Sequence, residues 1–307
     1  MNEHLKQETI NKILKREKLF QIREHRLKRL LQDPLQTLVF FLLSLISKIH
    51  PIPVTKKTPW GGIMKYDLPE GNQIFYYGFC ESNLTIFFIR FLKPGETFID
   101  IGANIGFYSM LASDLVGSTG KILSFEPTPR TFKTLQKNAL LQKNISVENM
   151  ALSDKDETIS IADYGSKFSG SNSLNPILPK EVDNFLKTTP TKIAIRATTL
   201  DAMVEQYTLH PSFIKIDVEG YESHVLKGMK NVLSLSRPVL SIEMCKHPEW
   251  KENVTETFSL LQKNNYRSYE ISPLGFLISC ERNSYNDINL IFVPEEKVQD
   301  LEYLMTK

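Results

Sequence analysis

The sequence predicts a doubly wound α/β fold, in which a mostly parallel sheet is covered by helices on both faces. Short apolar runs typical of buried strands, such as Thr97–Ile101, Lys121–Phe125 and Phe213–Ile216, recur along the chain. Longer segments with helical periodicity separate them, and strands that alternate with helices favour a parallel sheet. In such sheets ligands bind beyond the carboxyl ends of the strands, so the residues after each strand are the first candidates for a functional site.

The same patterns predict the other elements in chain order. Alternating residues around the turn sequence Leu68–Asn72 predict a β-hairpin over Trp60–Phe79. The remaining strands, of which the last three are expected to close a mixed sheet in antiparallel fashion, are predicted at Ile145–Met150, Thr158–Ala162, Ile193–Ala197, Val239–Met244, Tyr266–Ile271, Gly275–Cys280 and Asn289–Val293. Helices are predicted at Glu81–Leu92, Ile105–Leu115, Pro129–Lys143, Leu200–Tyr207, Tyr221–Leu235 and Trp250–Asn264.

Length and composition favour one large domain with an extension. The chain has 307 residues, of which 41% are hydrophobic and 23% charged, and its net charge of +2 gives no global reason for a nucleic-acid partner. Cys80, Cys245 and Cys280 form no C-x-x-C pair, so we expect no disulfide framework or zinc site, and a cytoplasmic location. We divide the chain into an N-terminal helical extension with a proline-rich connector, residues 1–59, and a main domain, residues 60–307.

The N-terminal extension allows two interpretations. Residues 1–33 have apolar residues at helical spacing, and nine basic residues there outnumber five acidic ones. The apolar run Leu35–Ile46 is about a dozen residues long, too short to span a bilayer and too far into the chain for a signal peptide. The extension either packs on the main domain or on a second subunit, or it makes peripheral membrane contact through residues 1–50, with a basic flank attracted to anionic lipid.

The segment Phe98–Ser109 is the most informative motif. It has the pattern of a buried strand, a glycine turn and a helix, with the carboxylate of Asp100 just before the turn. Gly102 and Gly106 allow a tight bend and leave room for a ligand, at which the next helix directs its positive N-terminus. Glu126 follows the next strand, at the usual place of an acid that binds ribose hydroxyls in a nucleotide-binding βαβ unit.

The glycine spacing and the acid together indicate which nucleotide binds. The turn Gly102–Gly106 does not fit the G-x-G-x-x-G pattern of a dinucleotide site. The carboxylate of Asp100 would repel a pyrophosphate, whereas it would attract the ammonium and sulfonium groups of S-adenosylmethionine. We therefore predict S-adenosylmethionine as the cofactor.

Further candidates fall at one edge of the predicted sheet. Five residues lie at or near the carboxyl ends of predicted strands, and these are Asp100, Glu126, Ala151, Asp217 and Glu243. Because the carboxyl ends of parallel strands meet at the same edge, we expect these residues to line one site.

With these residues in view, the chain resembles the FkbM family of S-adenosylmethionine-dependent methyltransferases. The resemblance covers about residues 75–295, and its most specific segments are Phe98–Ser109 and Phe213–Gly228. The other matching segments are Ser124–Pro127, Ala151–Asp154, Thr199–Asp201, Pro238–Glu243 and Asn289–Pro294. The resemblance implies a class I (Rossmann-like) methyltransferase fold, with a mixed seven-stranded sheet flanked by helices. It also implies O-methylation of a sugar, glycan or secondary metabolite.

The resemblance also implies roles for individual residues. By position, the methionine end of the cofactor would be held by Asp100, Gly102, Asn104 and Gly106. Glu126 would bind the ribose hydroxyls, and the backbone around Met150 and Ala151 would meet the adenine edge. Many methyltransferases that act on small molecules have an Asp where Met150 falls, so this chain departs from that pattern.

Methyl transfer to oxygen requires a group that accepts the proton of the hydroxyl. For this base we favour Asp217 or Glu219, with Glu243 and His247 as second choices, while Asp217 is also a candidate for holding the cofactor. We assign no metal site, although magnesium shared by Asp217 and Glu243 is an alternative, because hard oxygen ligands suit it. The chain lacks the Pro-Pro-aromatic clamp and the Pro-Cys nucleophile of DNA methyltransferases, so DNA is not an expected substrate.

Two other functions stay open. The basic N-terminal helix would suit an RNA ribose methyltransferase, and a noncatalytic protein could keep the fold for assembly or membrane attachment. The polar loop Tyr164–Pro179 is a candidate lid, and Tyr164, Phe168 and Trp250 are candidates for stacking on a sugar. A homo-oligomer is a further alternative.

Overall fold

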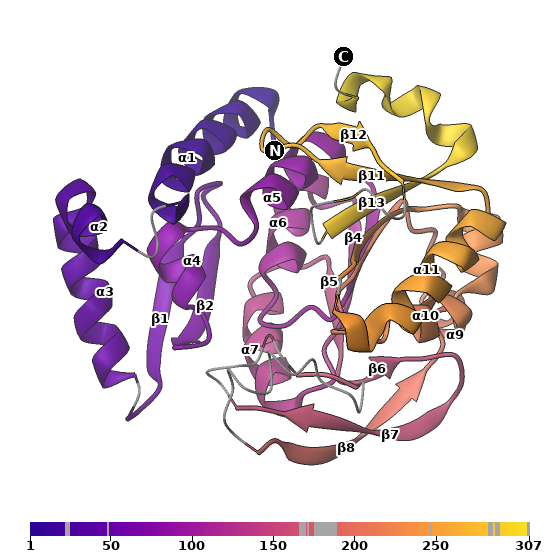
Figure 1. Cartoon of the computed structure of the whole chain (residues 1–307), viewed down its shortest axis with the longest axis horizontal. Helices are drawn as coiled ribbons and strands as arrows, with labels where there is room; N and C mark the ends of the chain where they lie inside the picture. Colours follow the sequence, from indigo (N-terminus) through magenta and orange to yellow (C-terminus); the bar gives the residue numbers. More distant parts are fainter. Residues whose placement is uncertain are drawn as a thin grey trace.

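The computed structural model describes residues 1–21, 25–47, 49–165, 170, 172–174, 189–245, 247–281, 285 and 289–305. A large mixed sheet runs through the molecule, with α5 to α7 on one face and α9 to α11 on the other (Figure 1). The predicted doubly wound α/β architecture is therefore confirmed. The N-terminal helices α1 to α3 lie beside this core, at the left of Figure 1.

The elements follow one another as expected for such a fold. The α-helices are α1 (Glu3–Gln21), α2 (Arg26–Gln32), α3 (Pro34–Ile46), α4 (Asn72–Tyr77), α5 (Ser82–Phe91), α6 (Phe107–Val116), α7 (Pro129–Ala139), α9 (Leu200–Gln206), α10 (Glu222–Lys227) and α11 (Lys251–Lys263). The strands are β1 (Ile52–Lys57), β2 (Ile63–Leu68), β3 (Thr97–Ile101), β4 (Lys121–Phe125), β5 (Ile145–Glu148), β6 (Ala151–Leu152), β7 (Glu157–Asp163), β8 (Thr191–Thr198), β9 (Phe213–Ile216), β10 (Val239–Glu243), β11 (Tyr266–Ile271), β12 (Leu277–Ser279) and β13 (Asn289–Pro294). Short helical segments are η2 (Val232–Ser236), η3 (Pro248–Trp250), η4 (Glu295–Lys297) and η5 (Gln299–Leu304).

The large sheet has the strand order β12-β11-β13-β10-β9-β3-β4-β5. The strands β10, β9, β3, β4 and β5 are parallel, while β13, β11 and β12 pair in antiparallel fashion, as predicted. The described part of the sheet has eight strands, one more than the expected seven, because the short edge strand β12 is included. Ile101 pairs with both Phe125 and Ile216, so the residues after β3, β4 and β9 emerge level at one edge.

An aromatic cluster fixes the helices that frame this edge. The ring of Phe88 in α5 packs edge-on against Phe98 of β3 and Phe213 of β9, with centroids 5.2 and 4.8 Å apart. Tyr108 of α6 packs on the same Phe88 ring at 4.7 Å. Such ring contacts add to the burial of apolar area and hold α5 and α6 against the central strands. The starts of both helices are thereby fixed near the carboxyl edge of the sheet.

The predicted hairpin over Trp60–Phe79 is wrong in its position. The hairpin is formed by β1 and β2, which pair from Ile52 with Leu68 to Lys57 with Ile63, and the segment after it forms α4. The expected connector thus contains a strand, because Pro53 is tolerated in a two-stranded sheet whose outer edges are unpaired. Asn138 of α7 holds this hairpin to the core through hydrogen bonds with the backbone of Lys65.

The helix predicted over Tyr221–Leu235 is interrupted. The α-helix α10 ends at Lys227, and the chain resumes as the π-helical segment η2. A Cβ atom on Gly228 would lie 1.9 Å from the carbonyl oxygen of Ser153. The close approach of these two backbones turns the chain at Gly228, which the helical pattern of the sequence does not indicate.

The N-terminal extension divides into a packed part and an exposed part. In α1 the side chains of Ile10 and Ile13 are 3% and 0% exposed, and the ammonium of Lys6 donates to the carbonyl oxygen of Leu92 at 3.2 Å. The helix α3 has no buried residue. Within the described residues, none of the helices is long and apolar enough to cross a membrane. Packing on the main domain is therefore correct for α1 and does not account for α3.

We predict that α1 contributes to the stability of the whole domain. Ile13→Ala removes a fully buried side chain, so it should lower the free energy of unfolding by about 2–4 kcal/mol in urea denaturation. Leu42→Ala in α3 is the matched control, because this side chain is 51% exposed, and it should change stability by less than about 0.5 kcal/mol. Small effects for both variants would show that α1 does not belong to the cooperative unit.

Candidate functional site

The glycine turn after β3 presses against the end of β9. The turn residues Gly102 and Gly106 have φ values of +81° and +90°, which glycine adopts without strain. A Cβ atom on Gly102 would lie 1.8 Å from the carbonyl oxygen of Asp217. The turn therefore requires glycine for both conformation and space, and it brings Asp217 beside the start of α6. The predicted strand, turn and helix are confirmed here.

Glu126 connects this turn to the end of β4. Its carboxylate accepts hydrogen bonds from the backbone N–H of Thr128 at 2.8 Å and of Asn104 at 3.0 Å. The side chain is 6% exposed, and burial raises its pKa to about 7. Each carboxylate oxygen retains acceptor capacity after these bonds, so Glu126 can still receive hydroxyl donors from a ligand.

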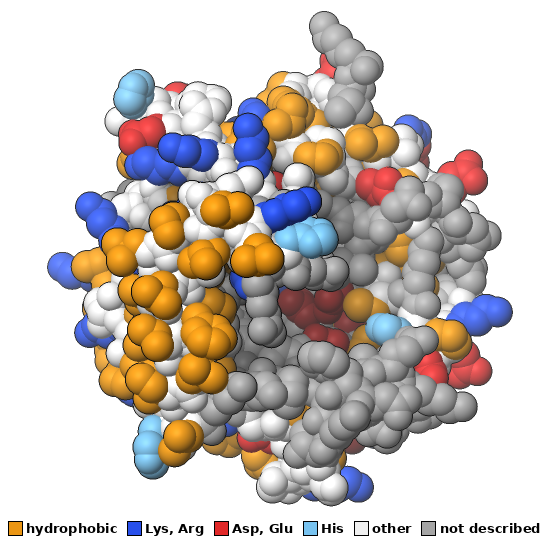
Figure 2. Space-filling view, turned by 60° about the vertical axis from the view of Figure 1, so that its left-hand side comes forward, with side chains coloured by type: hydrophobic (Ala, Val, Ile, Leu, Met, Phe, Trp, Pro, Cys, Tyr) orange, Lys and Arg blue, Asp and Glu red, His pale blue; other side chains and the backbone are white. Residues whose placement is uncertain are grey.

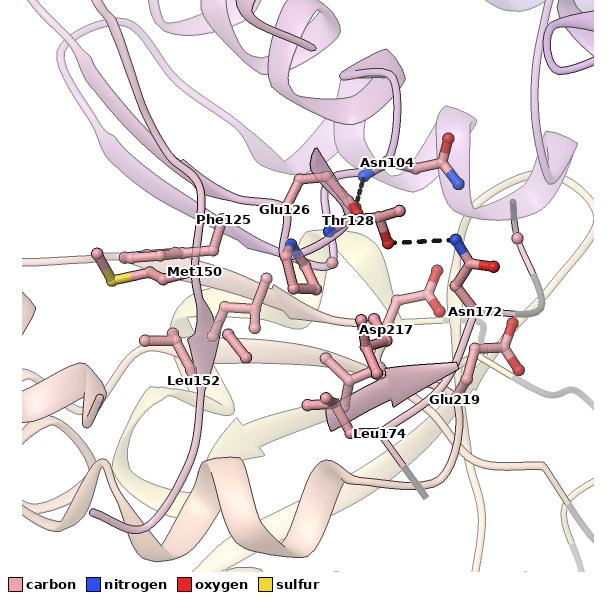
Figure 3. Close-up of a pocket in the computed structure, with 17 residues that line it drawn as sticks. Asn104, Phe125, Glu126, Thr128, Met150, Leu152, Asn172, Leu174, Asp217 and Glu219 are labelled. Atoms are coloured by element: carbon pink, nitrogen blue, oxygen red, sulfur yellow. Dashed lines mark hydrogen bonds between the residues drawn. The ribbon is translucent and has the colours of Figure 1, made fainter. Parts of the chain in front are cut away.

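A cavity opens in front of Glu126. Figure 3 shows the side chains of Phe125, Met150 and Leu152 at one end of it and the carboxylates of Asp217 and Glu219 at the other. Ala151 also lines this cavity, and Asn172 donates a hydrogen bond to the hydroxyl of Thr128 at 3.2 Å across its mouth. Along this one cavity, an apolar end is thus followed by the Glu126 carboxylate, which can accept hydrogen bonds from hydroxyl groups, and then by an acidic end.

A second cavity continues from the first and shares Gly102, Asn104 and Asp217 with it. Asp100 lies in its wall and is 1% exposed. One carboxylate oxygen accepts from the hydroxyl of Ser109 at 2.6 Å, whereas the other, Oδ1, is buried and has no hydrogen-bond partner among the described residues. A buried acceptor without a donor is costly, so this oxygen favours a ligand that brings a donor or a positive charge.

Lys215 provides the positive charge of the site and was not foreseen from the sequence. Its ammonium is buried in the middle of β9 and forms an ion pair with Asp217 at 2.6 Å. Burial disfavours this charge, but attraction to Asp217, Glu81 and Asp100 raises the pKa of Lys215, so it stays protonated. A lysine within an otherwise apolar buried strand was the signal that could have identified it.

Three carboxylates gather beside this ion pair. One oxygen from each of Asp217, Glu219 and Glu243 lies within 4.8 Å of the others. Glu219 has a φ of +52°, and a Cβ on the following Gly220 would lie 2.6 Å from the ring of Trp250. The acid is therefore held at a fixed place by a turn that needs glycine next to it.

The three carboxylates differ in how readily they ionise. Burial, and then repulsion from Asp217, raise the pKa of Glu243 well above its ordinary value. Burial, and then repulsion from Asp217, also raise the pKa of Glu219 well above its ordinary value. For Asp217, burial works against ionisation, but the Lys215 ammonium and a hydrogen bond from Glu243 hold its pKa below the ordinary value. The cluster thus keeps one stable carboxylate and two groups that can hold or accept a proton.

The structure brings most of the predicted residues together. The two cavities are lined by Asp100, Gly102, Asn104, Glu126, Ala151 and Asp217. Gly106 shapes the turn, since a Cβ there would lie 2.7 Å from Leu135. His247 lies edge-on against Trp250 at 5.3 Å and is not part of the carboxylate cluster, so its role as a base stays a prediction.

The predicted lid and its aromatic residues are only partly described. Most of Tyr164–Pro179, including Phe168, lies outside the described residues, although Asn172 lines the first cavity. Tyr164 and Trp250 are buried, at 8% and 3% exposure. The ring of Trp250 packs beneath Gly220.

Glu81 is a further residue that the sequence analysis missed. It precedes α5, lines the second cavity and accepts a hydrogen bond from the hydroxyl of Tyr108 at 2.9 Å. Burial raises its pKa, and the Lys215 ammonium opposes this shift. No local pattern marks Glu81, because its partners come from distant parts of the chain.

Comparisons with known proteins show the family of this chain. Residues 100–268 match the model of the methyltransferase FkbM domain. A hexuronic acid methyltransferase, AglP, from Haloferax volcanii is 31% identical over 137 residues, which are 44% of this chain and 50% of that protein. The match thus spans about half the length of this curated relative.

Two solved structures are also similar. The methyltransferase FkbM from Methylobacillus flagellatus is 16% identical, with 73% of this chain and 55% of that chain covered and a TM-score of 0.42. A SAM-dependent O-methyltransferase from Thermotoga maritima is 15% identical, with 78% and 76% covered and a TM-score of 0.37.

We predict a pH-dependent stability from Glu222, which supports the turn that carries Glu219. Its carboxylate accepts hydrogen bonds from the backbone N–H of Gly220 and the side chain of Asn253, and burial raises its pKa from 4.5 to about 7. Because the folded state binds this proton more tightly than the unfolded state, stability from this group is complete below pH 4.5 and is lost as the pH rises through 7.

Glu222→Gln should therefore raise the free energy of unfolding at about pH 8 by about 1–3 kcal/mol and leave it nearly unchanged at about pH 4.5. Urea denaturation of both proteins at the two pH values measures this difference. Because Glu126 titrates in the same range in both proteins, the comparison isolates Glu222. A variant that is less stable at the higher pH would show that the carboxylate is stabilised in its ionised form.

Proposed function

Because this chain belongs to the FkbM methyltransferase family, we propose that it transfers the methyl group of S-adenosylmethionine to a hydroxyl group of a sugar, glycan or related metabolite. The observation that carries this proposal is the order in which apolar and acidic side chains line the two joined cavities. They offer, in order, an apolar end, the carboxylate of Glu126, and the carboxylates around Asp217 and Asp100.

The residues present fit this cofactor. The apolar end formed by Phe125, Met150 and Leu152 suits an adenine ring, and Glu126 can accept hydrogen bonds from two ribose hydroxyls. The unpartnered oxygen of Asp100 suits the ammonium of the methionine end. When bound, the cofactor supplies a methyl group on a positively charged sulfur.

Electrostatics favours a positively charged ligand at the acidic end. The Lys215 ammonium holds the pKa of Asp217 below its ordinary value, but it only partly opposes the raised pKa values of Asp100 and Glu81, so negative charge is in excess around it. An added positive charge at about 4 Å from a carboxylate gains about 4 kcal/mol at an effective dielectric constant of about 20. This gain would be largest for the buried groups that are otherwise driven to protonate.

We assign the role of proton acceptor to Glu219, with Glu243 as its partner. Glu219 lines the first cavity, and a raised pKa suits a base that works near neutral pH. Asp217 is bound to Lys215, which supports a positioning role for it. The alternative is that Asp217, Glu219 and Glu243 hold a divalent cation, which their 4.8 Å grouping would permit.

The proposal that a sugar accepts the methyl group rests on the similarity to a hexuronic acid methyltransferase. A screen of sugar nucleotides, glycans and lipid-linked saccharides for uptake of labelled methyl groups tests it. Labelling of RNA alone would instead support ribose methylation, and a protein that does not bind the cofactor would support a noncatalytic role.

We predict that the protein binds S-adenosylmethionine through Glu126. In calorimetry, Glu126→Gln should weaken binding by about 10–100-fold, because a hydrogen bond to a charged group contributes about 1.5–3 kcal/mol. Glu96→Gln is the matched control, since Glu96 lies before β3 at the opposite end of the strand. Affinity of the unchanged protein should fall as the pH drops below 7, because protonation of Glu126 removes acceptor capacity. Unchanged affinity in Glu126→Gln would refute this assignment.

We predict that Glu219→Gln separates catalysis from binding. At saturating cofactor it should lower the rate of methyl transfer by about 10²–10⁴-fold, while the dissociation constant for S-adenosylmethionine changes by less than about threefold. Asp217→Asn should affect both quantities, because Asp217 lines both cavities. Loss of activity on adding a chelator, with recovery on adding magnesium, would instead favour the divalent cation.

A further inference from the structure

The surface formed by α2 and α3 is apolar and exposed. We call it the apolar face, and it consists of Leu27, Leu30, Leu31, Leu35, Leu38, Val39, Phe41, Leu42, Leu45 and Ile46. The exposure of these side chains runs from 37% for Val39 to 84% for Leu31. They form a continuous group on one side of the molecule (Figure 2). Groups of this kind on a protein surface mark sites of interaction with another protein or with a membrane.

The helix α3 exposes apolar side chains and directs polar side chains toward the protein, which is the opposite of an ordinary surface helix. Its polar residues point inward, where Gln36 donates to the carbonyl oxygen of Phe75 at 3.0 Å and Thr37 is bonded to the hydroxyl of Tyr76. The ring of Phe40 packs on the rings of Phe75 and Tyr76. At 3.6 residues per turn, the exposed residues of α3 from Phe41 to Val39 cover an outward arc of about 160° that contains no charged residue. The helix is thus held in place with its apolar side outward.

Basic residues border the apolar face. Lys28 is exposed in α2, next to Leu27 of the apolar face. Figure 2 shows Lys and Arg side chains along the upper and left-hand borders of the apolar group. The segment Pro34–Ile46 itself contains no charged residue. An apolar face with a cationic border is complementary to a surface that is apolar inside and anionic outside.

We propose that the apolar face docks on the surface of a bilayer that contains anionic lipids. With 13 residues, α3 is too short to cross the hydrocarbon core, so it would lie in the plane of the interface. A second copy of the chain is a weaker candidate for the occupant. A symmetric pair would bring two cationic borders together, and the resulting repulsion is absent when the partner is anionic lipid.

Docking in this way would bring the functional site to the bilayer. Figure 2 shows acidic side chains at the bottom of a hollow on the same side of the molecule as the apolar face. The helix α4, on which α3 packs, contributes Gln73 and Ile74 to the second cavity. An acceptor held at the bilayer surface by a lipid tail would then reach the site without leaving the membrane, a consequence that rests on the proposed function.

Co-sedimentation with vesicles tests the proposal. The full chain should bind vesicles of phosphatidylcholine with about one-third phosphatidylglycerol at least about tenfold more than vesicles of phosphatidylcholine alone, and binding should weaken when salt rises from about 0.1 M to about 0.5 M. The triple variant Leu35→Ser, Leu38→Ser, Leu42→Ser should reduce binding at least about tenfold. The matched control replaces Leu140, Leu235 and Leu274, which are 81%, 81% and 48% exposed outside the apolar face, and should bind as the unchanged protein does.

Three outcomes would overturn the proposal. These are absence of binding to the anionic vesicles, equal binding by the apolar-face variant, and a dimer in light scattering that this variant dissociates without any vesicle binding. Calorimetry with S-adenosylmethionine is run on the same variants as a test of folding and should give unchanged affinity. Because cofactor binding and vesicle binding are measured separately, failure of this proposal and failure of the proposed function are distinguishable.

Discussion

The buried ammonium of Lys215 is the interaction on which the arrangement of the site depends. It lies in the middle of the sheet, where an unpaired charge would be very costly, and it is paired with Asp217. That pairing does not neutralise the other nearby carboxylates, which are Glu81, Asp100, Glu219 and Glu243. Their pKa values are raised, chiefly by burial, so their charged forms are disfavoured unless further positive charge arrives. The site is thus prepared for a cation, and this requirement links the packing of β9 to the proposed chemistry.

Close backbone contacts determine where those carboxylates lie. Gly102 touches the carbonyl of Asp217, and Gly220 touches the ring of Trp250. At both contacts a side chain would push the acid away from the cavities. The positions of the acids are therefore set by the backbone of short turns, which the parallel strands bring to one edge. This explains how groups distant in sequence share one small volume.

The N-terminal region combines a packed helix and an exposed apolar helix in one segment. The helix α1 is part of the core through Ile10 and Ile13, while α3 is held by polar contacts on its inner side and leaves its apolar side uncovered. Between them and the site lies α4, whose Ile74 is buried and also lines the second cavity. The extension is accordingly continuous with the site, and a boundary at residue 59 separates elements that pack together.

The sequence alone determined the strands of the large sheet, the glycine turn and the acids at the carboxyl edge, because apolar runs and glycine spacing are local properties. The prediction of Asp100, Glu126 and Asp217 as neighbours needed only the rule that parallel strands end together. The tertiary structure alone decided the pairing of Lys215 with Asp217, the different pKa shifts of Asp217 and Glu219, the break of the helix at Gly228 and the outward side of α3. Each of these depends on contacts between residues far apart in the chain, and burial, pKa and exposure arise only from such contacts.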